Sequence, residues 1–316
     1  MTAGPDIVRY VLDDGVRDVL AKELNSRLAD AEPLDPDAHG VILASIGASA
    51  LLQHLPDELL AELGKFTRGH SSVLVLENLP RYDAPPTPVG GFTPEAALAP
   101  VNALQLGLVR LLGTTPFAVP YENRGRVMRN VVPNPAAAGT TSSWGSDAEF
   151  FWHTDNPHLP FGEQGRDPRP NVPRHLTFYA IRNDERVPTD VVGVDTVLAR
   201  LTPAAREALA RPEFEIGAPA SVETGAQPAL RGAVLEHDGA APRMRYDHGT
   251  TRGLTARAAA ALDELTAALR TDDAERFVLR PGDFLLFDNY RVLHRRRAFT
   301  PRPAATARWL RRCYAS

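Results

Sequence analysis

The chain has 316 residues, enough for one large domain or two modest domains at roughly 100 to 200 residues each. Apolar residues make up 43% and charged residues 23%, which excludes a disordered, collagen-like or coiled-coil chain. Its 35 Lys and Arg against 39 Asp and Glu leave a net charge of −4, so no overall basic field favours nucleic acid or an anionic membrane. We therefore expect a small, individually recognised substrate.

Cysteine content and the amino terminus indicate the compartment. Cys313 is the single cysteine, so no intrachain disulfide can form. Residues 1–10 lack a basic segment followed by an apolar run, and no stretch approaches the roughly 18 apolar residues that a membrane span needs. These features predict a cytoplasmic protein without a membrane partner.

The first part of the sequence predicts helices followed by one strand. Leu59, Leu63 and Phe66 form an apolar stripe with acidic residues in the first turn, which indicates an amphipathic helix. We predict a helical layer over about residues 1–70. The next expected elements are a buried strand at 71–77 and a helix at 97–112 that ends at Gly113.

The remainder has the short apolar runs and turn residues of β-structure. Residues 121–132 are expected to be extended, and residues 133–146 form a long loop that is either a lid or a simple excursion. Further strands are expected at 175–181, at 284–293 and at 308–314, and helices after Thr202 and around 262–269. We predict one domain over residues 1–316, of α+β class and mainly β, built as a double-stranded β-helix (jelly-roll) barrel with flanking α-helices.

Three residues could bind one metal ion. His153 and Asp155 lie two positions apart, a spacing that places both on one face of a strand, but chance alone predicts about one such pair here. His294 ends the apolar run 284–293 and adds a third donor. Two histidines and one carboxylate form a facial triad that suits non-haem Fe(II).

A resemblance to a known family rests on three sequence segments. They are the block His153-Thr154-Asp155, the run from Gly282 to His294, and Arg308-Trp309-Leu310-Arg311-Arg312. Together they resemble the Fe(II)/2-oxoglutarate-dependent dioxygenases, and within them the clavaminate synthase-like (TauD/TfdA-type) group. This group includes amino-acid hydroxylases of antibiotic biosynthesis.

The resemblance implies roles for individual residues. Fe(II) would be bound by His153, Asp155 and His294. Arg308 would bind the distal carboxylate of 2-oxoglutarate through its planar guanidinium, with Thr189 beside the cosubstrate. Arg312 lies on the same strand face as Arg308 and would help to bind the cosubstrate or the carboxylate of the substrate.

The same resemblance implies the reaction. O2 and 2-oxoglutarate would be consumed, succinate and CO2 released, and an unactivated C–H of a free amino acid or a derived small molecule hydroxylated. The candidate substrate contacts are Asp247, Arg312, Thr141 and Ser143. Free arginine is not the first choice, because only Asp247 offers an obvious carboxylate for a guanidinium. The Asp155 carboxylate also argues against a halogenase.

Several alternatives stay open at this point. The same cofactors could support desaturation or cyclisation. A two-His, one-carboxylate site could instead bind Zn(II) for hydrolysis, and a catalytically silent jelly-roll binding protein is the third class. The run Arg295-Arg296-Arg297 is typical of a solvated basic cluster. The sequence does not name the substrate, the oxidised carbon or the oligomeric state.

Overall fold

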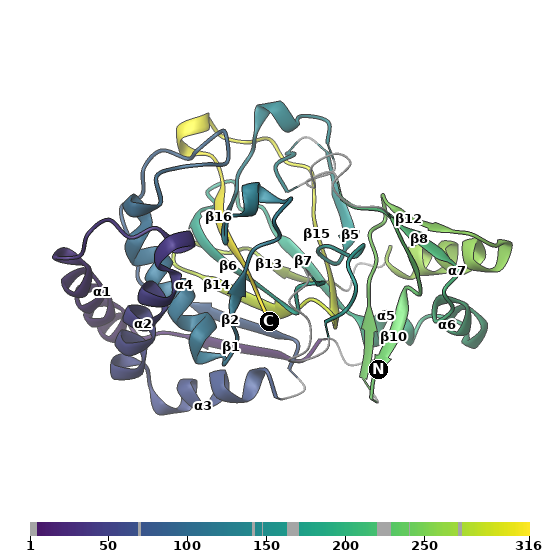
Figure 1. Ribbon diagram of the computed structural model, residues 1–316, viewed down its shortest axis with the longest axis horizontal. Helices are drawn as coiled ribbons and strands as arrows, with labels where there is room; N and C mark the ends of the chain where they lie inside the picture. The colour runs from purple at the N-terminus through teal and green to yellow at the C-terminus, as the bar shows by residue number, and fades with distance from the viewer. Residues whose placement is uncertain are drawn as a thin grey trace.

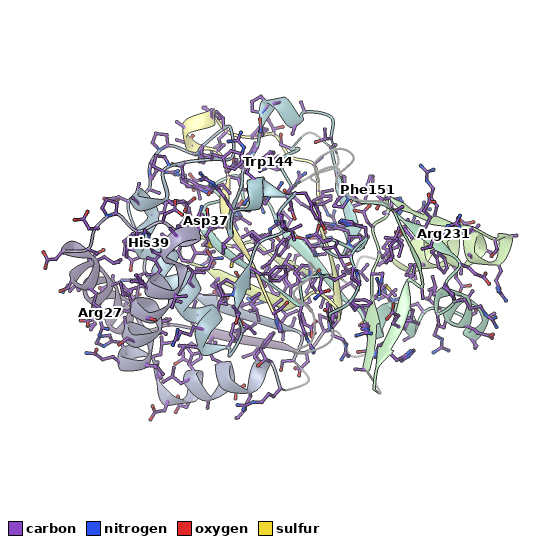
Figure 2. The ribbon with its side chains drawn as sticks, viewed as in Figure 1. Arg27, Asp37, His39, Trp144, Phe151 and Arg231 are labelled. Atoms are coloured by element: carbon purple, nitrogen blue, oxygen red, sulfur yellow. The ribbon has the colours of Figure 1, made fainter. Side chains whose placement is uncertain are left out.

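The computed structural model describes residues 5–68, 71–140, 143–146, 148–162, 171–219, 229–239, 241–270 and 274–316. Figure 1 shows a group of helices on one side, β-sheets in the centre, and a smaller lobe with its own helices on the other side. Arg27 and Arg231 mark the two ends of this long axis (Figure 2). None of the helices among the described residues combines the length and the apolar character that crossing a bilayer requires.

The predicted helical layer is present. It consists of α1 (Asp14–Ala29), α2 (Pro36–His54), α3 (Asp57–Phe66) and α4 (Ala99–Leu111), the last preceded by the 3-10 turn η1 (Glu95–Leu98). The side chains of Asp13 and Asp35 cap α1 and α2. Helices α2 and α4 cross at Gly47 and Gly107, where a Cβ on Gly47 would lie 1.7 Å from the Ala103 carbonyl oxygen. Only glycine permits this approach of the two backbones.

A seven-stranded sheet lies against these helices. Its strands are β1 (Ile7–Val11), β2 (Val73–Glu77), β14 (Phe284–Asp288), β6 (His175–Arg182), β16 (Trp309–Ala315), β3 (Pro116–Phe117) and β4 (Met128–Val131). Along β14, Phe284 and Leu286 face the helices, whereas Leu285 and Phe287 face the centre of the molecule. The sheet is therefore buried on both faces.

One element of the amino-terminal region is a strand, although a helical layer was expected there. Residues Ile7–Val11 form β1, which pairs in parallel with β2 at the sheet edge. The prediction of a purely helical layer over residues 1–70 was wrong here, because five residues carry too short a pattern to separate a strand from a helix. The partner strand lies more than 60 residues later, where local sequence gives no sign of the pairing.

A four-stranded sheet covers the inner face of the larger one. It contains β13 (Glu275–Phe277), β7 (Thr189–Gly193), β15 (Val292–Arg296) and β5 (Phe150–His153). The run 284–293, expected to be one strand, is divided between the two sheets by a turn. An Asp288 carboxylate oxygen accepts the Tyr290 N–H at 2.9 Å in that turn. Apolar side chains of both sheets, among them Phe178, Val191 and Phe287, form the core between them.

The third part is the lobe at the far end. Its helices are α5 (Val194–Leu198), α6 (Pro203–Leu209) and α7 (Ala256–Ala268), and its strands are β8 (Phe214–Ile216), β9 (Leu230–Gly232), β10 (Leu235–Asp238), β11 (Ala241–Met244) and β12 (Thr251–Gly253). The Thr202 hydroxyl accepts the Ala205 N–H at 3.2 Å and caps α6 as predicted. Leu265 and Leu269 are buried in the core of this lobe, so the leucine stripe serves packing.

Candidate metal centre

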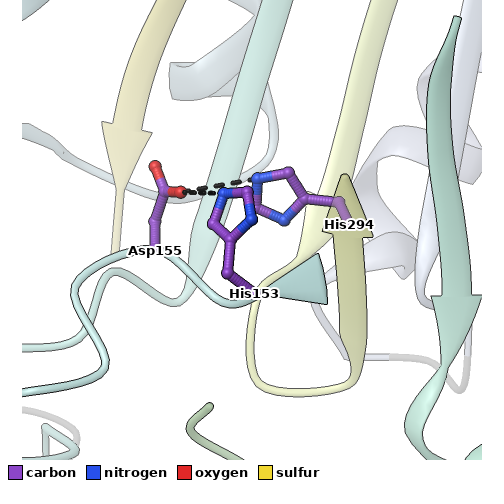
Figure 3. Close-up of side chains that lie close together, drawn as sticks. All are labelled: His153, Asp155 and His294. Atoms are coloured by element: carbon purple, nitrogen blue, oxygen red, sulfur yellow. Dashed lines mark ion pairs between the residues drawn. The ribbon is translucent and has the colours of Figure 1, made fainter. Parts of the chain in front are cut away.

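Two neighbouring strands bring the three candidate metal ligands together. His153 ends β5 and lies opposite His294 of β15 in the antiparallel pairing. Asp155 follows two residues after His153, beyond the end of the strand. Its Oδ1 lies 3.4 Å from Nε2 of each histidine, and all three side chains are buried (Figure 3). The predicted cluster is therefore assembled. Asp155 was expected to share a strand with His153, but it lies beyond the end of that strand.

The chemistry of this donor set fits a divalent cation. His153 Nδ1 lies 2.6 Å from the Phe151 carbonyl oxygen, and a carbonyl accepts only from an N–H, so Nε2 keeps its lone pair. That Nε2 is buried and has no hydrogen-bond partner within the described residues. Burial, with His153 nearby, lowers the pKa of His294 to about 4, which makes it a neutral ligand at pH 7. Two imidazoles and a carboxylate thus converge where a cation would fit.

Asp155 is fixed by contacts to both its backbone and its side chain. The Asn289 side chain accepts the Asp155 N–H at 2.9 Å and donates to the Asp155 carbonyl at 3.1 Å. Arg312 and the Tyr314 hydroxyl each donate to Oδ2 at 2.8 Å. Burial would raise the pKa of Asp155, but the Arg312 guanidinium holds that pKa well below its usual range. The carboxylate is therefore ionised, and its Oδ1 is turned toward the histidines.

Glu122 is a site residue that the sequence interpretation missed. It accepts from Arg312 at 2.7 Å and from Arg129 at 2.9 Å, and the Asn156 amide donates to it at 3.1 Å. Burial would raise the pKa of Glu122, but Arg312 and Arg129 lower it. Nothing in the local sequence marks this acid, because its partners lie up to 190 residues away. Arg312 thus binds two buried carboxylates, those of Glu122 and Asp155.

The cluster opens into a cavity of about 650 Å³, its mouth included. Asp155, Glu122 and Arg312 line this cavity, and so do Arg308 and Thr189. The remaining lining residues include Val131, Ser143, Phe150, Phe178, Asp247 and Arg296. All but one of the predicted site residues therefore face one space; the exception, Thr141, lies outside the described residues.

Arg308 is a buried cation without an anion. Its side chain is only 3% exposed, and no carboxylate of the described residues forms an ion pair with its guanidinium. Glu185 instead accepts the backbone N–H of Arg308 at 3.0 Å. Burial and the nearby Arg296 lower the pKa of Arg308 to about 9, which still leaves it charged at pH 7. A buried charge of this kind is costly unless an anion binds it.

Asp247 and Ser143, two of the predicted substrate contacts, also line the cavity. Asp247 Oδ1 accepts the N–H groups of Gly249 and Thr250 at 2.8 and 3.0 Å, so this oxygen is occupied by its own turn. No hydrogen bond to its Oδ2 is formed within the described part of the chain. The Ser143 hydroxyl is buried, lines the cavity and has no protein partner there. Both side chains can therefore contact a ligand.

The prediction of a solvated cluster at Arg295-Arg296-Arg297 was wrong. Arg295 and Arg297 both donate to the buried Asp190 carboxylate at 3.0 Å. Arg296 is 6% exposed and donates to the carbonyls of Ser146 and Ala148. Sequence alone cannot show this, because Asp190 reaches the cluster only through the pairing of β7 with β15.

Comparison with known proteins agrees with this geometry. A family model described as the taurine catabolism dioxygenase TauD, TfdA family matches residues 89–314. The fold and the site therefore belong to a dioxygenase, and the chain is a member of the TauD/TfdA family. The predicted resemblance is confirmed.

Individual relatives narrow the class further. The chain is 31% identical to L-asparagine oxygenase of Streptomyces coelicolor over 274 residues, covering 82% of this chain and 76% of that protein. It is 25% identical to the enduracididine beta-hydroxylase of Streptomyces hygroscopicus, with 96% and 92% of the two chains covered. The solved structure of asparagine oxygenase in complex with Fe(II), hydroxyasparagine and succinate matches with a TM-score of 0.81 at 26% identity, covering 97% of this chain and 92% of that chain.

These findings confirm the predicted enzyme class and its cofactor pair, Fe(II) and 2-oxoglutarate. They favour the oxygenase over the zinc hydrolase and the silent binding protein.

Proposed function

We propose that this protein hydroxylates an unactivated C–H of a free amino acid, or of a small molecule derived from one, in specialised metabolism. The observation that carries the proposal is one cavity that holds three features. They are the cluster of His153, Asp155 and His294, the uncompensated Arg308, and the oppositely charged pair of Arg312 and Glu122. The relatives named for asparagine and enduracididine support an amino-acid substrate and a link to antibiotic biosynthesis.

The first two features suit the cofactors. His153, Asp155 and His294 would bind Fe(II), and Arg308 would bind the distal carboxylate of 2-oxoglutarate, with the Thr189 hydroxyl beside it. When bound, Fe(II) and 2-oxoglutarate supply the oxidation, in which one atom of O2 enters succinate and the other enters the substrate. The protein residues bind, orient and exclude water, so that one C–H bond of the substrate lies nearest the metal.

The third feature suits a zwitterion. Arg312 and Glu122 are both buried, line the cavity and form an ion pair with each other at 2.7 Å. An α-amino acid carries a carboxylate for Arg312 and an ammonium for Glu122, so it can replace this internal pair without leaving a buried charge unpaired. A substrate without the carboxylate would leave Arg312 without its partner, and one without the ammonium would leave Glu122 without its partner. The pair therefore favours a free amino acid over a peptide.

The side-chain end of the substrate would meet Asp247 and Ser143. Asp247 can accept from an amide, ammonium or guanidinium through its Oδ2. One carboxylate suits an amide or an amine better than a guanidinium, which has five N–H groups to satisfy. Thr141 and most of the segment 161–173 lie outside the described residues, so they remain predictions as contacts or as determinants of specificity.

The finer architectural predictions are proposals too. We infer that the two larger sheets are the halves of a jelly-roll barrel, because they share one apolar core and carry the cluster between them. We infer a single domain over residues 1–316, since the helices α1–α4 pack directly on the larger sheet. Its lone, buried Cys313 and its expected dependence on Fe(II) are in keeping with a reducing, cytoplasmic location.

An anaerobic titration tests the function. Fe(II) and then 2-oxoglutarate are added to metal-free protein, and the weak visible charge-transfer band of a chelated keto acid is recorded. We expect a band in the wild type that His153→Ala abolishes and Arg308→Ala weakens. Amino acids are then screened in air by succinate release. An iron-loaded, folded wild type without a band would overturn the proposal.

A further inference from the structure

Tyr314 is part of the buried network but has no role in the function proposed above. It lies on β16 two residues after Arg312, and its side chain faces the same interior. Its hydroxyl lies 2.8 Å from Asp155 Oδ2 and 3.2 Å from a Glu122 oxygen. The Asn156 amide donates to the phenol oxygen at 3.1 Å. A phenol has one proton, so the shorter contact assigns that proton to Asp155.

The tyrosine ring is held by two contacts. The Arg312 guanidinium lies 3.9 Å from the ring centroid, and the ring of Phe117 stacks at 5.8 Å. The residue is only 5% exposed. The hydroxyl therefore has one accessible position, and that position is against Asp155.

Asp155 has two carboxylate oxygens with different surroundings. Oδ1 faces both histidines, whereas Oδ2 accepts from Tyr314 and Arg312. With Oδ2 occupied in this way, only Oδ1 can reach a cation. A one-oxygen ligand leaves the open positions that a two-His, one-carboxylate site needs for its cosubstrates.

The two donors to Oδ2 are not equivalent. Arg312 also binds Glu122 and is the group to which a substrate carboxylate would bind, so its contact with Asp155 is open to competition. The neutral hydroxyl of Tyr314 attracts an anion far less. We propose that Tyr314 is a positioning residue, whose hydroxyl keeps Asp155 a one-oxygen ligand while Arg312 binds the substrate. This inference rests on the metal ligands of the proposed function.

The test compares two tyrosines that are equally buried. Tyr314→Phe removes the donor to Asp155. Tyr179→Phe is the matched control, because Tyr179 donates to the Pro80 carbonyl on the opposite face of the sheet. Tyr314→Phe loses the bond to Asp155 and the bond from the Asn156 amide, whereas Tyr179→Phe loses the bond to Pro80. Both variants therefore lose buried hydrogen bonds, but only the first acts on Asp155. Fe(II) affinity is measured anaerobically on metal-free protein, followed by the charge-transfer band with 2-oxoglutarate.

Loss of such an outer contact typically weakens metal binding 10- to 100-fold. We expect Tyr314→Phe to bind Fe(II) about tenfold more weakly, with a shifted or weaker band, and Tyr179→Phe to match the wild type. Fe(II) affinity within twofold of wild type and an unchanged band in Tyr314→Phe would overturn this inference but leave the proposed function intact. Absence of the band in the wild type would instead overturn the proposed function, and this inference with it.

A second variant covers the case in which Tyr314→Phe does not fold. Asn156 has a φ of 53°, so Asn156→Gly removes the amide that fixes the tyrosine oxygen without straining the backbone. We expect a smaller loss of Fe(II) affinity in the same direction. Unchanged affinity in this variant would count against the positioning role of Tyr314.

Discussion

Arg308 lies directly before β16 and Arg312 in the middle of that strand, four residues on, and both guanidiniums are buried in the same cavity. Arg312 is neutralised by Asp155 and Glu122, and although burial opposes its charge, these acids raise its pKa above the usual value. No acid of the described residues forms an ion pair with the Arg308 guanidinium, and burial lowers the pKa of Arg308. The difference indicates two kinds of site. Acids of the protein itself balance the charge of Arg312, whereas the charge of Arg308 is balanced only when an anion binds.

The largest expected effect follows from removing the neutralised arginine. Arg312→Met leaves Asp155 and Glu122 with less compensation in a buried place, which should lower the free energy of unfolding by about 3 to 5 kcal/mol. Urea unfolding of the metal-free protein measures this loss. A loss below about 1 kcal/mol would show that water or a rearrangement compensates these acids.

Arg311 gives a control on the other face of the same strand. It binds Glu95 of η1 through both terminal nitrogens, toward the helices and away from the cavity. Arg311→Met should destabilise the fold by a comparable amount, again about 3 kcal/mol, but should leave 2-oxoglutarate affinity unchanged.

The reverse pattern is expected for Arg308. Arg308→Met should weaken 2-oxoglutarate binding roughly 100-fold, because a two-pronged contact between charged groups contributes about 3 kcal/mol. The free energy of unfolding should stay the same or rise, since an uncompensated buried cation is removed. Titration of the charge-transfer band and urea unfolding measure the two quantities. Strong destabilisation by this variant would contradict the comparison drawn above.

His175 illustrates a third way to bury an ionisable group, as a neutral base. Burial lowers the pKa of His175 to about 4, while the unfolded chain titrates near 6.5. The unfolded state therefore binds more protons below pH 6.5, and stability falls as the pH drops toward 4. Between pH 7 and pH 5 this residue should account for a loss of about 2 kcal/mol. Urea unfolding should show a correspondingly weaker pH dependence in His175→Gln.

The smallest effect concerns the loop over the Arg312 side of the cavity. Trp144, labelled in Figure 2, has its ring centroid 4.6 Å from the guanidinium carbon of Arg129, which binds Glu122. A Cβ on Gly91, at a φ of 77°, would meet the Trp144 ring at 2.7 Å. Gly91→Ala should cost about 1 kcal/mol and raise the KM of the amino-acid substrate several-fold, with 2-oxoglutarate affinity unchanged.

Gly113→Ala is the matched control for that experiment. Gly113 has a similar φ of 72° but open space around its Cβ position. It should show the same loss of stability and no change in KM. An equal rise of KM in both variants would show that Trp144 does not shape the substrate side.

Local sequence was sufficient for several of the longer elements and for the metal cluster. The helices at Asp57–Phe66 and Ala256–Ala268 and the strand His175–Arg182 were predicted from periodicity and turn residues, because these patterns record burial on one face. The residues of the cluster were found from residue type and from a resemblance in short motifs. Arg308 was found in the same way.

The tertiary structure decided what surrounds each of these groups. Sequence spacing placed Arg308 and Arg312 on one face, but only the folded chain brings Glu122 to Arg312, while the Arg308 guanidinium has no ion pair within the described part of the chain. Pairing between distant strands also buries Arg296 and adds β1 to the sheet. Residue type and local period determine which groups are available. The energy of a buried charge depends on neighbours that are remote in the sequence, and therefore on the fold.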